Sequence, residues 1–118
     1  ISKNLLRSIF FPRSPLHDGA VIISNGIIEA ARCTLPLTQK TNIGGIDLGM
    51  RHRAAVGITE QADVICIVVS EETGSISIAQ DGNISRGVSK EFLYNRLSDV
   101  LNISKDKGWK SIFENFSK

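Results

Sequence analysis

The sequence predicts an α/β domain with a mixed central β-sheet flanked by helices. Apolar residues at helical spacing alternate along the chain with short strand-like runs, which is the pattern of layered α/β proteins. One continuous apolar run, Val64–Ser70, is typical of a strand buried on both faces. Glycine-containing turn sequences at 24–26 and 81–83 separate further strands. With 118 residues, the chain is long enough for one domain with a modest core.

The first 35 residues predict a helix and a hairpin. Ser2 can cap a short helix that has three apolar residues on one face, Leu5, Leu6 and Ile9. Two prolines interrupt the chain within 10–15. Strands are then expected over 20–23 and 27–35, and the turn between them makes a hairpin.

The middle of the chain predicts a loop, a helix and a strand. Residues 36–48 are polar and glycine-containing, so we expect a long loop that is functional or mobile. A helix is expected over 51–62, with four residues facing inward: Ala54, Ala55, Ile58 and Ala62. The buried strand Val64–Ser70 follows, and an acidic turn over 71–74 ends it.

The last third predicts two strands and a helix. Ile76 and Ile78 alternate with serines in one strand, and another begins at Ile84. Ser89 is expected to cap a helix whose apolar face consists of Leu93, Leu97, Val100 and Leu101. A C-terminal helical extension is expected over 103–118, with an apolar stripe that either packs or binds a partner: Trp109, Ile112, Phe113 and Phe116.

Composition excludes several classes of protein. The chain is 42% hydrophobic and 22% charged, as in ordinary folded proteins, and its net charge of +2 is too small for nucleic-acid binding by bulk electrostatics. No apolar run reaches the roughly 18 residues of a membrane span, and no secretory signal is present. The chain begins at Ile1, so we expect a fragment of a longer protein. Cys33 and Cys66 lie in apolar runs and are expected to be buried, reduced thiols.

Arg51-His52-Arg53 is the most informative stretch. The three side chains stand at the start of the expected helix, where free N–H groups and the helix dipole already carry positive partial charge. Cations there oppose the dipole by about 0.3–1 kcal/mol each, so two arginines favour a bound anion such as a polyphosphate. The alternative is a solvated basic helix start.

His17-Asp18-Gly19 forms a second candidate site directly before a strand. The imidazole and carboxylate suit Mn²⁺ or a similar divalent ion, and Asp18 alternatively suits a general base for a hydroxyl group. An ordinary Asp-Gly turn is the structural alternative. After the apolar strand, the two adjacent carboxylates of the acidic turn are expected to be solvated; the alternative is that Ser70 donates to a phosphate and one of the glutamates completes a metal site.

These stretches carry a family resemblance. LHDGAVII, GMRHRAAVGI and VVSEETGSISIA resemble the diadenylate cyclase domain, whose signature is a DGA motif followed by an RHR motif. The resemblance covers residues 2–102, so we expect a diadenylate cyclase domain over 1–102. It is greatest to the membrane-anchored housekeeping cyclases of Gram-positive bacteria, and smaller to the DNA-scanning branch. The chain lacks the helix and central strand with which this family's domain begins.

The resemblance implies a role for each motif residue. Asp18 would lie near the ribose 3′-hydroxyl and the metal, and Gly19 and Ala20 would let the nucleotide approach the backbone. The triphosphate would be held by Arg51, His52, Arg53 and Ser70. Leu35 would read adenine through its main chain. His17, Asp18 and Glu72 would contact Mn²⁺ or Mg²⁺, with Co²⁺ as a further candidate.

Two positions depart from the family pattern. Met50 occupies the place of a threonine in the nucleotide site, which removes a hydroxyl group. Thr34 replaces a residue that is often aromatic in the anchored branch, so it cannot stack on adenine.

We therefore expect an enzyme that condenses two ATP into cyclic di-AMP and releases pyrophosphate, across a transient face-to-face homodimer. No nucleic-acid partner is expected. We expect a cytoplasmic domain, at the membrane face if an anchor precedes it in the full-length protein. The alternative functions are a catalytically weak adenine-nucleotide-sensing or interaction module, and a phosphohydrolase.

Overall fold

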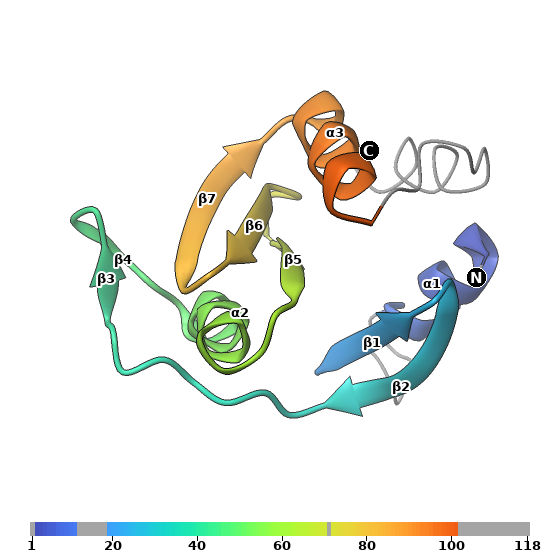
Figure 1. The fold of residues 1–118 in the computed structure, drawn as a ribbon, viewed down its shortest axis with the longest axis horizontal. Coiled ribbons are helices and arrows are strands. Elements are labelled where there is room, and N and C mark those ends of the chain that lie inside the picture. Colours follow the sequence, from blue (N-terminus) through green and yellow to red (C-terminus); the bar gives the residue numbers. More distant parts are fainter. Residues whose placement is uncertain (1, 12–18, 71, 102–118) are drawn as a thin grey trace. The chain divides into compact units, whose positions relative to one another are not determined.

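The computed structural model describes residues 2–11, 19–70 and 72–101, and the side chains up to residue 99. The chain divides into two compact units, residues 1–35 and 36–118. Helices and strands alternate along the chain, so the predicted α/β class is confirmed (Figure 1). The predicted extension over 103–118 and its apolar stripe lie outside the described residues.

The first unit contains the predicted helix and hairpin. Helix α1 spans Lys3–Ile9, and Ser2 Oγ accepts a hydrogen bond from the Leu5 N–H at 3.1 Å, as expected of a cap. Strands β1 (Ala20–Ser24) and β2 (Ile27–Cys33) pair antiparallel. Leu5 is 48% exposed, so its predicted place on the buried face of α1 is wrong, while the other two residues of that face are buried.

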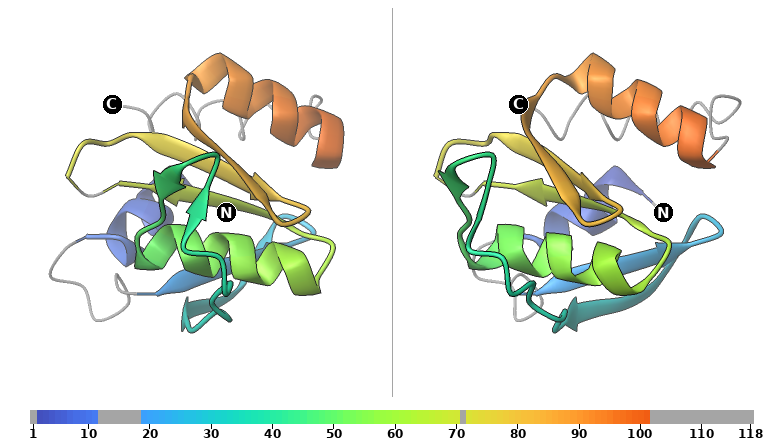
Figure 2. Two further views of the ribbon diagram at one scale, coloured as in Figure 1. Left: turned by 90° about the vertical axis from the view of Figure 1, so that its left-hand side faces the viewer. Right: turned by 60° about the vertical axis from the view of Figure 1, so that its left-hand side comes forward.

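The second unit has three layers. Strands β5 (Ile65–Val69), β6 (Ile76–Gln80) and β7 (Asn83–Val88) form an antiparallel sheet in the order β5-β6-β7. Helix α2 (Met50–Gln61) covers one face of the sheet, and helix α3 (Lys90–Leu101) covers the opposite face (Figures 1 and 2). Ser89 caps α3 as predicted, accepting from the Phe92 N–H at 3.1 Å.

The middle strand, β6, is buried on both faces. The strand predicted from the alternation of Ile76 and Ile78 with serines is confirmed, and four consecutive residues from Ile76 to Ala79 are buried in it. Ala79 packs with Ala55 and Val56 of α2, so Ser77 and Ala79 lie on the α2 side of the sheet. Ile76 and Ile78 point the other way, toward the helix that buries Leu93 and Leu97.

Strand β5 is an edge strand, and its predicted burial on both faces is wrong. Val68 faces α2 and is buried in the core, but Ile67 on the other face is 38% exposed. β5 pairs only with β6 among the described strands, which leaves part of its surface uncovered.

Helix α2 buries one of the four residues predicted to face inward, Ala55, and otherwise buries a different set. Ala62 is exposed, and Ala54 and Ile58 are only half-buried. The buried residues are Ala55, Val56, Gly57 and Thr59. The reason is a second contact: the extended chain at 36–38 passes directly over Gly57, where a Cβ would lie 1.9 Å from the Pro36 carbonyl oxygen.

The predicted loop over 36–48 contains a small hairpin that sequence reasoning missed. Strands β3 (Asn42–Ile43) and β4 (Ile46–Asp47) pair antiparallel across Gly44-Gly45. The sequence could have predicted this hairpin, because two glycines between isoleucines are a pattern typical of a two-residue hairpin turn.

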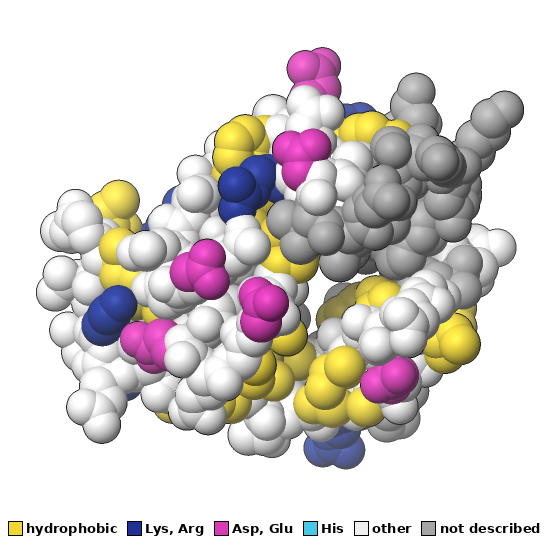
Figure 3. Space-filling view, in the orientation of Figure 1, with side chains coloured by type: hydrophobic (Ala, Val, Ile, Leu, Met, Phe, Trp, Pro, Cys, Tyr) yellow, Lys and Arg dark blue, Asp and Glu magenta, His cyan; other side chains and the backbone are white. Residues whose placement is uncertain are grey.

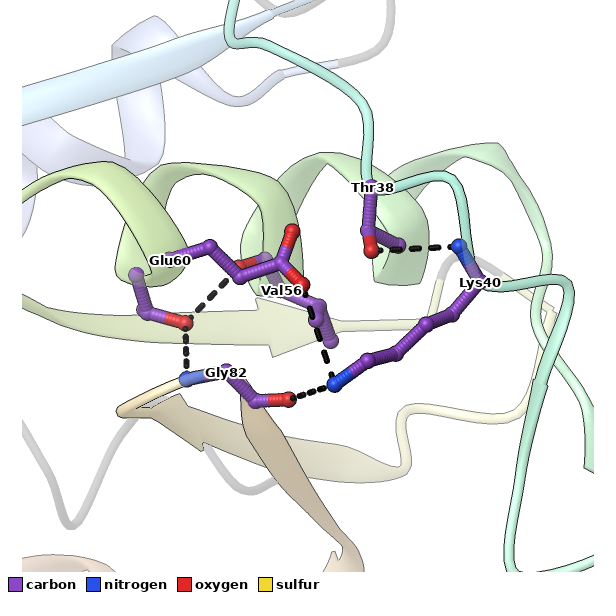
Figure 4. A network of polar contacts seen from close by, with 6 residues as sticks. Thr38, Lys40, Val56, Glu60 and Gly82 are labelled. Atoms are coloured by element: carbon purple, nitrogen blue, oxygen red, sulfur yellow. Dashed lines mark hydrogen bonds and ion pairs between the residues drawn. The ribbon is translucent and has the colours of Figure 1, made fainter.

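A polar network joins this segment to α2 and to the β6–β7 turn (Figure 4). Lys40 Nζ donates to the Gly82 carbonyl at 3.2 Å and lies 3.7 Å from the Glu60 carboxylate. Thr59 Oγ1 accepts from the Gly82 N–H at 3.0 Å and donates to the Val56 carbonyl at 2.8 Å.

Candidate functional site

The candidate residues of the second unit gather at one end of its sheet. Helix α2 and strand β5 are joined by only three residues and pack against each other, so they run in opposite directions. The start of α2 and the turn that follows β5 therefore lie at the same end of the unit, as both views of Figure 2 show. Arg51 in the first turn of α2 and Ser70 directly after β5 therefore both belong to this end of the unit.

The first turn of α2 presents backbone donors. Gly49 is the N-cap residue, no side chain caps the helix, and no acidic residue stands in its first turn. Met50 is 63% exposed and Arg51 is also exposed. An uncapped helix start with an adjacent guanidinium can bind an anionic group.

His52 differs from its arginine neighbours because it is uncharged near neutral pH. Partial burial, and secondarily the positive charge of Arg86, lower the pKa of His52 below its ordinary value. The ring contacts the sheet, with Nε2 3.4 Å from Ser77 Oγ. His52 is thus a neutral hydrogen-bonding group rather than a third cation.

Arg53 turns toward the neighbouring chain segment. Its Nη2 donates to the Thr38 carbonyl at 3.0 Å, and the Thr38 N–H donates to the Arg53 carbonyl at 3.1 Å. Its Nε is buried without a hydrogen-bond partner among the described residues. The side chain therefore fastens the 36–38 segment to α2.

Ser70 organises the turn after β5. Its Oγ accepts from the Thr73 N–H at 3.3 Å, and its carbonyl accepts from the Gly74 N–H at 2.9 Å. Accepting these bonds leaves the hydroxyl proton of Ser70 able to donate to a phosphate oxygen. Glu72 lies exposed in the same turn.

The first unit holds the other candidate residues. His17 and Asp18 lie outside the described residues. Gly19 has φ +118°, and a Cβ there would lie 2.9 Å from the Arg32 backbone. Only glycine fits this position, because β2 passes too closely for any side chain. Ala20 begins β1, and Leu35 is half-buried at the end of the unit.

A protein-family model accounts for most of these motifs. The model described as "DAC: DisA bacterial checkpoint controller nucleotide-binding" matches residues 1–84. The chain belongs to the DAC family.

Two relatives of this DAC chain are named as a cyclic di-AMP synthase and a diadenylate cyclase. It is 52% identical over 93 residues to "Cyclic di-AMP synthase CdaA" of Bacillus subtilis, and 50% identical over 101 residues to "Diadenylate cyclase" of Listeria monocytogenes. These alignments cover 79% and 86% of the chain but only 34% and 37% of the relatives, so the chain spans about a third of their length.

Identity to the DNA-scanning branch is lower, as predicted. The "DNA integrity scanning protein DisA" of Clostridium acetobutylicum is 28% identical over 64 residues, which are 54% of this chain and 18% of that protein.

Solved structures agree with the DAC assignment. A crystal structure of a double mutant of DacA from Staphylococcus aureus superposes with a TM-score of 0.78 at 47% identity, covering 84% of this chain and 65% of that one. A "hypothetical membrane spanning protein" of Bacillus cereus superposes with a TM-score of 0.67 at 48% identity, covering 73% of this chain and 42% of that one. Among the described residues of the DAC chain, no helix is long and apolar enough to cross a bilayer.

On the face of the DAC chain drawn in Figure 3, both acidic and basic side chains are present, and several acidic side chains lie near one another over the second unit. No cluster of three or more His, Cys, Asp or Glu side chains occurs within the described ranges. Of the three predicted metal ligands, these ranges include only Glu72, whose exposed carboxylate is an oxygen donor suited to Mn²⁺ or Mg²⁺.

Sequence reasoning missed the residues that support the RHR stretch. Ser77 contacts His52 across 25 positions, and Thr38 contacts Arg53 across 15. The sequence around Ser77 and Thr38 contains no local pattern that predicts these contacts. The close packing at Gly57 could have been predicted. A glycine inside a helix costs about 1 kcal/mol relative to alanine, so its presence there usually indicates that another segment packs closely against it.

Proposed function

We propose that this DAC chain supplies the catalytic domain of a diadenylate cyclase. Two ATP molecules are condensed into cyclic di-AMP, and two pyrophosphates leave. Each ribose 3′-hydroxyl attacks the α-phosphate of the other ATP, forming a P–O bond as the bond to pyrophosphate breaks. The relatives' names and the ordered DGA and RHR motifs support this reaction.

One observation carries the proposal furthest: the uncapped start of α2, with Arg51 exposed beside it, lies at the same end of the unit as the Ser70 turn. Backbone N–H groups, a guanidinium and a hydroxyl are suited to hold a triphosphate without covalent chemistry. Catalysis then consists mainly of positioning and charge neutralisation.

The remaining roles follow from the motifs. Asp18 accepts the proton of the attacking 3′-hydroxyl, or orients that hydroxyl. Gly19 and Ala20 lie against the nucleotide, and the main chain of Leu35 reads adenine. His17, Asp18 and Glu72 hold a divalent metal, Mn²⁺ or Mg²⁺ with Co²⁺ as a further candidate, which neutralises phosphate charge when it is bound.

Each active site holds one ATP, so two chains bring their sites face to face in a transient homodimer. We place the domain in the cytoplasm, at the membrane face if the full-length protein is anchored.

A second candidate function rests on Met50. An exposed thioether at the first position of α2 supplies no hydroxyl to a phosphate, which favours a nucleotide-sensing module with little activity. Product formation separates the two functions.

The test is incubation with ATP and Mn²⁺, followed by chromatography for cyclic di-AMP and an assay for pyrophosphate. We expect both products. Asp18→Asn should abolish synthesis with ATP binding retained, and Arg51→Ala should weaken ATP binding by about tenfold or more, since a charge-assisted contact is worth about 1.5–3 kcal/mol. Arg96→Ala is the matched control, because Arg96 hydrogen-bonds Gln80 on the α3 side of the sheet.

Two outcomes would contradict the cyclase, and a third would contradict the role of Asp18. ATP binding without product would favour the sensing module, and release of ADP or AMP would indicate a phosphohydrolase. Normal synthesis by Asp18→Asn would remove Asp18 from the mechanism.

A further inference from the structure

Ser77 is a buried hydroxyl group in the interface between α2 and the sheet. It lies in the middle of β6 and is 2% exposed. Its neighbours on this face are apolar, including Ala79 and Val68. A hydroxyl group buried in such surroundings costs free energy unless it is hydrogen-bonded, so its partner matters.

That partner is the ring of His52, with Oγ 3.4 Å from Nε2. The distance is at the long end for a hydrogen bond, so the contact adds little to stability. Its effect is on the ring instead. A neutral imidazole has one nitrogen that donates and one that accepts, and the hydrogen bond at one nitrogen selects the tautomer.

A β-bulge places a cation next to this pair. In the β6–β7 ladder Ile76 pairs with Val88 and Ile78 pairs with Ser85, which leaves two residues, Arg86 and Gly87, opposite Ser77. Bulges redirect side chains. Arg86 Nη1 donates to the Asp47 carbonyl of β4 at 3.1 Å, and its charge acts on His52.

The other ring nitrogen faces the helix start. Nδ1 of His52 lies 3.9 Å from the point that a Cβ on Gly49 would occupy. Gly49 is the N-cap of α2, so a proton on Nδ1 lies beside the first turn of this helix.

We propose that Ser77 is a positioning residue: its hydroxyl donates to Nε2 of His52 and fixes the tautomer with the proton on Nδ1, which then donates to a phosphate oxygen at the start of α2. Only the identity of this ligand, ATP, rests on the proposed function. His52 thereby adds a directed hydrogen bond to the charge supplied by Arg51.

The tautomer is measured directly by ¹⁵N NMR of the imidazole rings, without ATP. The chain has only two histidines, and His17→Asn assigns the signals. Ser77→Thr and Ser77→Val form a matched pair, because threonine and valine share a shape and differ by the hydroxyl group. If the protein does not fold with the larger side chain of Ser77→Thr or Ser77→Val, Ser77→Ala is used in their place.

We expect the Nδ1–H form to predominate in the unmodified protein and in Ser77→Thr. In Ser77→Val and Ser77→Ala the Nε2–H form, which free histidine prefers in water, should become the major one. An unchanged ratio of tautomers in the variants without a hydroxyl would overturn the proposal.

Calorimetric titration with ATP tests the consequence for binding. Ser77→Val should weaken ATP binding about threefold to tenfold, because only the minor fraction of chains with the ring in the Nδ1–H form can then donate to the phosphate, and Ser77→Thr should restore it. Ser98→Ala is the control, since Ser98 Oγ is buried without a described partner, and it should leave the affinity unchanged. A tautomer change with unaltered affinity would refute the ligand contact. If the tautomer responds but no variant binds ATP, the proposed function fails and the Ser77–His52 pairing stands.

Discussion

Gly57 shows how one residue fixes the path of the chain beside the candidate site. A glycine inside a helix costs about 1 kcal/mol relative to alanine. Here the missing side chain lets the backbone at 36–38 contact α2, because a Cβ would lie 1.9 Å from the Pro36 carbonyl oxygen and 2.7 Å from the Thr38 nitrogen. Arg53 then fastens the same segment through its hydrogen bond to Thr38.

We therefore expect Gly57→Ala to lower the free energy of unfolding by about 2 kcal/mol or more, since overpacking against backbone outweighs the better helix propensity. Urea denaturation measures the change. Gly49→Ala is the control, because a Cβ there would meet nothing closer than His52 Nδ1 at 3.9 Å. A Gly57→Ala protein as stable as the original would mean that the 36–38 segment does not pack on α2.

His52 gives a pH dependence whose sign is fixed by its environment. Burial, and then Arg86, lower its folded-state pKa below the ordinary value of 6.5. The unfolded chain therefore binds a proton at a pH where the folded chain does not. The contribution of His52 to stability is fully present above pH 6.5 and is lost as the pH falls through the lower, folded pKa.

The measurement is the difference in unfolding free energy between the protein and His52→Asn, from pH 8 to pH 5. Subtraction removes the other titrating groups. We expect a constant difference above pH 7 and a decline of the His52 protein relative to the variant below pH 6.5. Parallel curves over the whole range would show that His52 titrates normally in the folded chain.

At the scale of elements, α2 is joined to the β6–β7 turn by the buried hydroxyl of Thr59. Thr59 Oγ1 accepts from the Gly82 N–H, which is itself buried, and donates to the Val56 carbonyl (Figure 4). The neighbouring Lys40–Glu60 ion pair is about half-exposed at the lysine, so it adds little.

Replacing Thr59 by valine keeps the shape and removes the acceptor of the Gly82 N–H. We expect Thr59→Val to cost about 1–3 kcal/mol, the penalty of an unsatisfied buried amide. Thr59→Ser keeps the hydroxyl and loses one methyl group, so it should cost about 1 kcal/mol or less. Thermal unfolding of both variants compares the two, and equal stability would show that water satisfies the Gly82 N–H.

At the scale of the whole molecule, the proposed reaction requires two chains. Cyclic di-AMP has two-fold symmetry, and in the proposed mechanism each site holds one ATP, so two sites would have to oppose each other. Specific activity should therefore fall on dilution at saturating ATP and metal, once the dimer dissociates. Activity that stays constant over about a hundredfold dilution, with light scattering showing only monomers, would exclude the two-chain mechanism and the cyclase.

The local features of the chain and its family can be predicted from the residues alone. The caps Ser2 and Ser89, the turns at 24–26 and 81–83, and helix α2 from its start to Gln61 all follow from residues within a few positions of one another. Local hydrogen bonding and allowed backbone angles decide such features, so they can be predicted from the sequence without knowledge of the tertiary structure. The DGA and RHR motifs were sufficient to indicate the DAC family in the same way.

Which faces are buried, and where the site side chains point, depends instead on how the elements pack together. Ala62 is exposed and Gly57 buried because a segment 20 residues earlier crosses α2, and Ser77 is buried because both faces of β6 are covered. The division of Arg51, His52 and Arg53 into an exposed cation, a neutral ring and a guanidinium fastened to Thr38 depends on partners 15 and 25 positions away. Burial and hydrogen-bond partners at such separations are set by packing between elements, which hydrophobic periodicity along the chain does not encode.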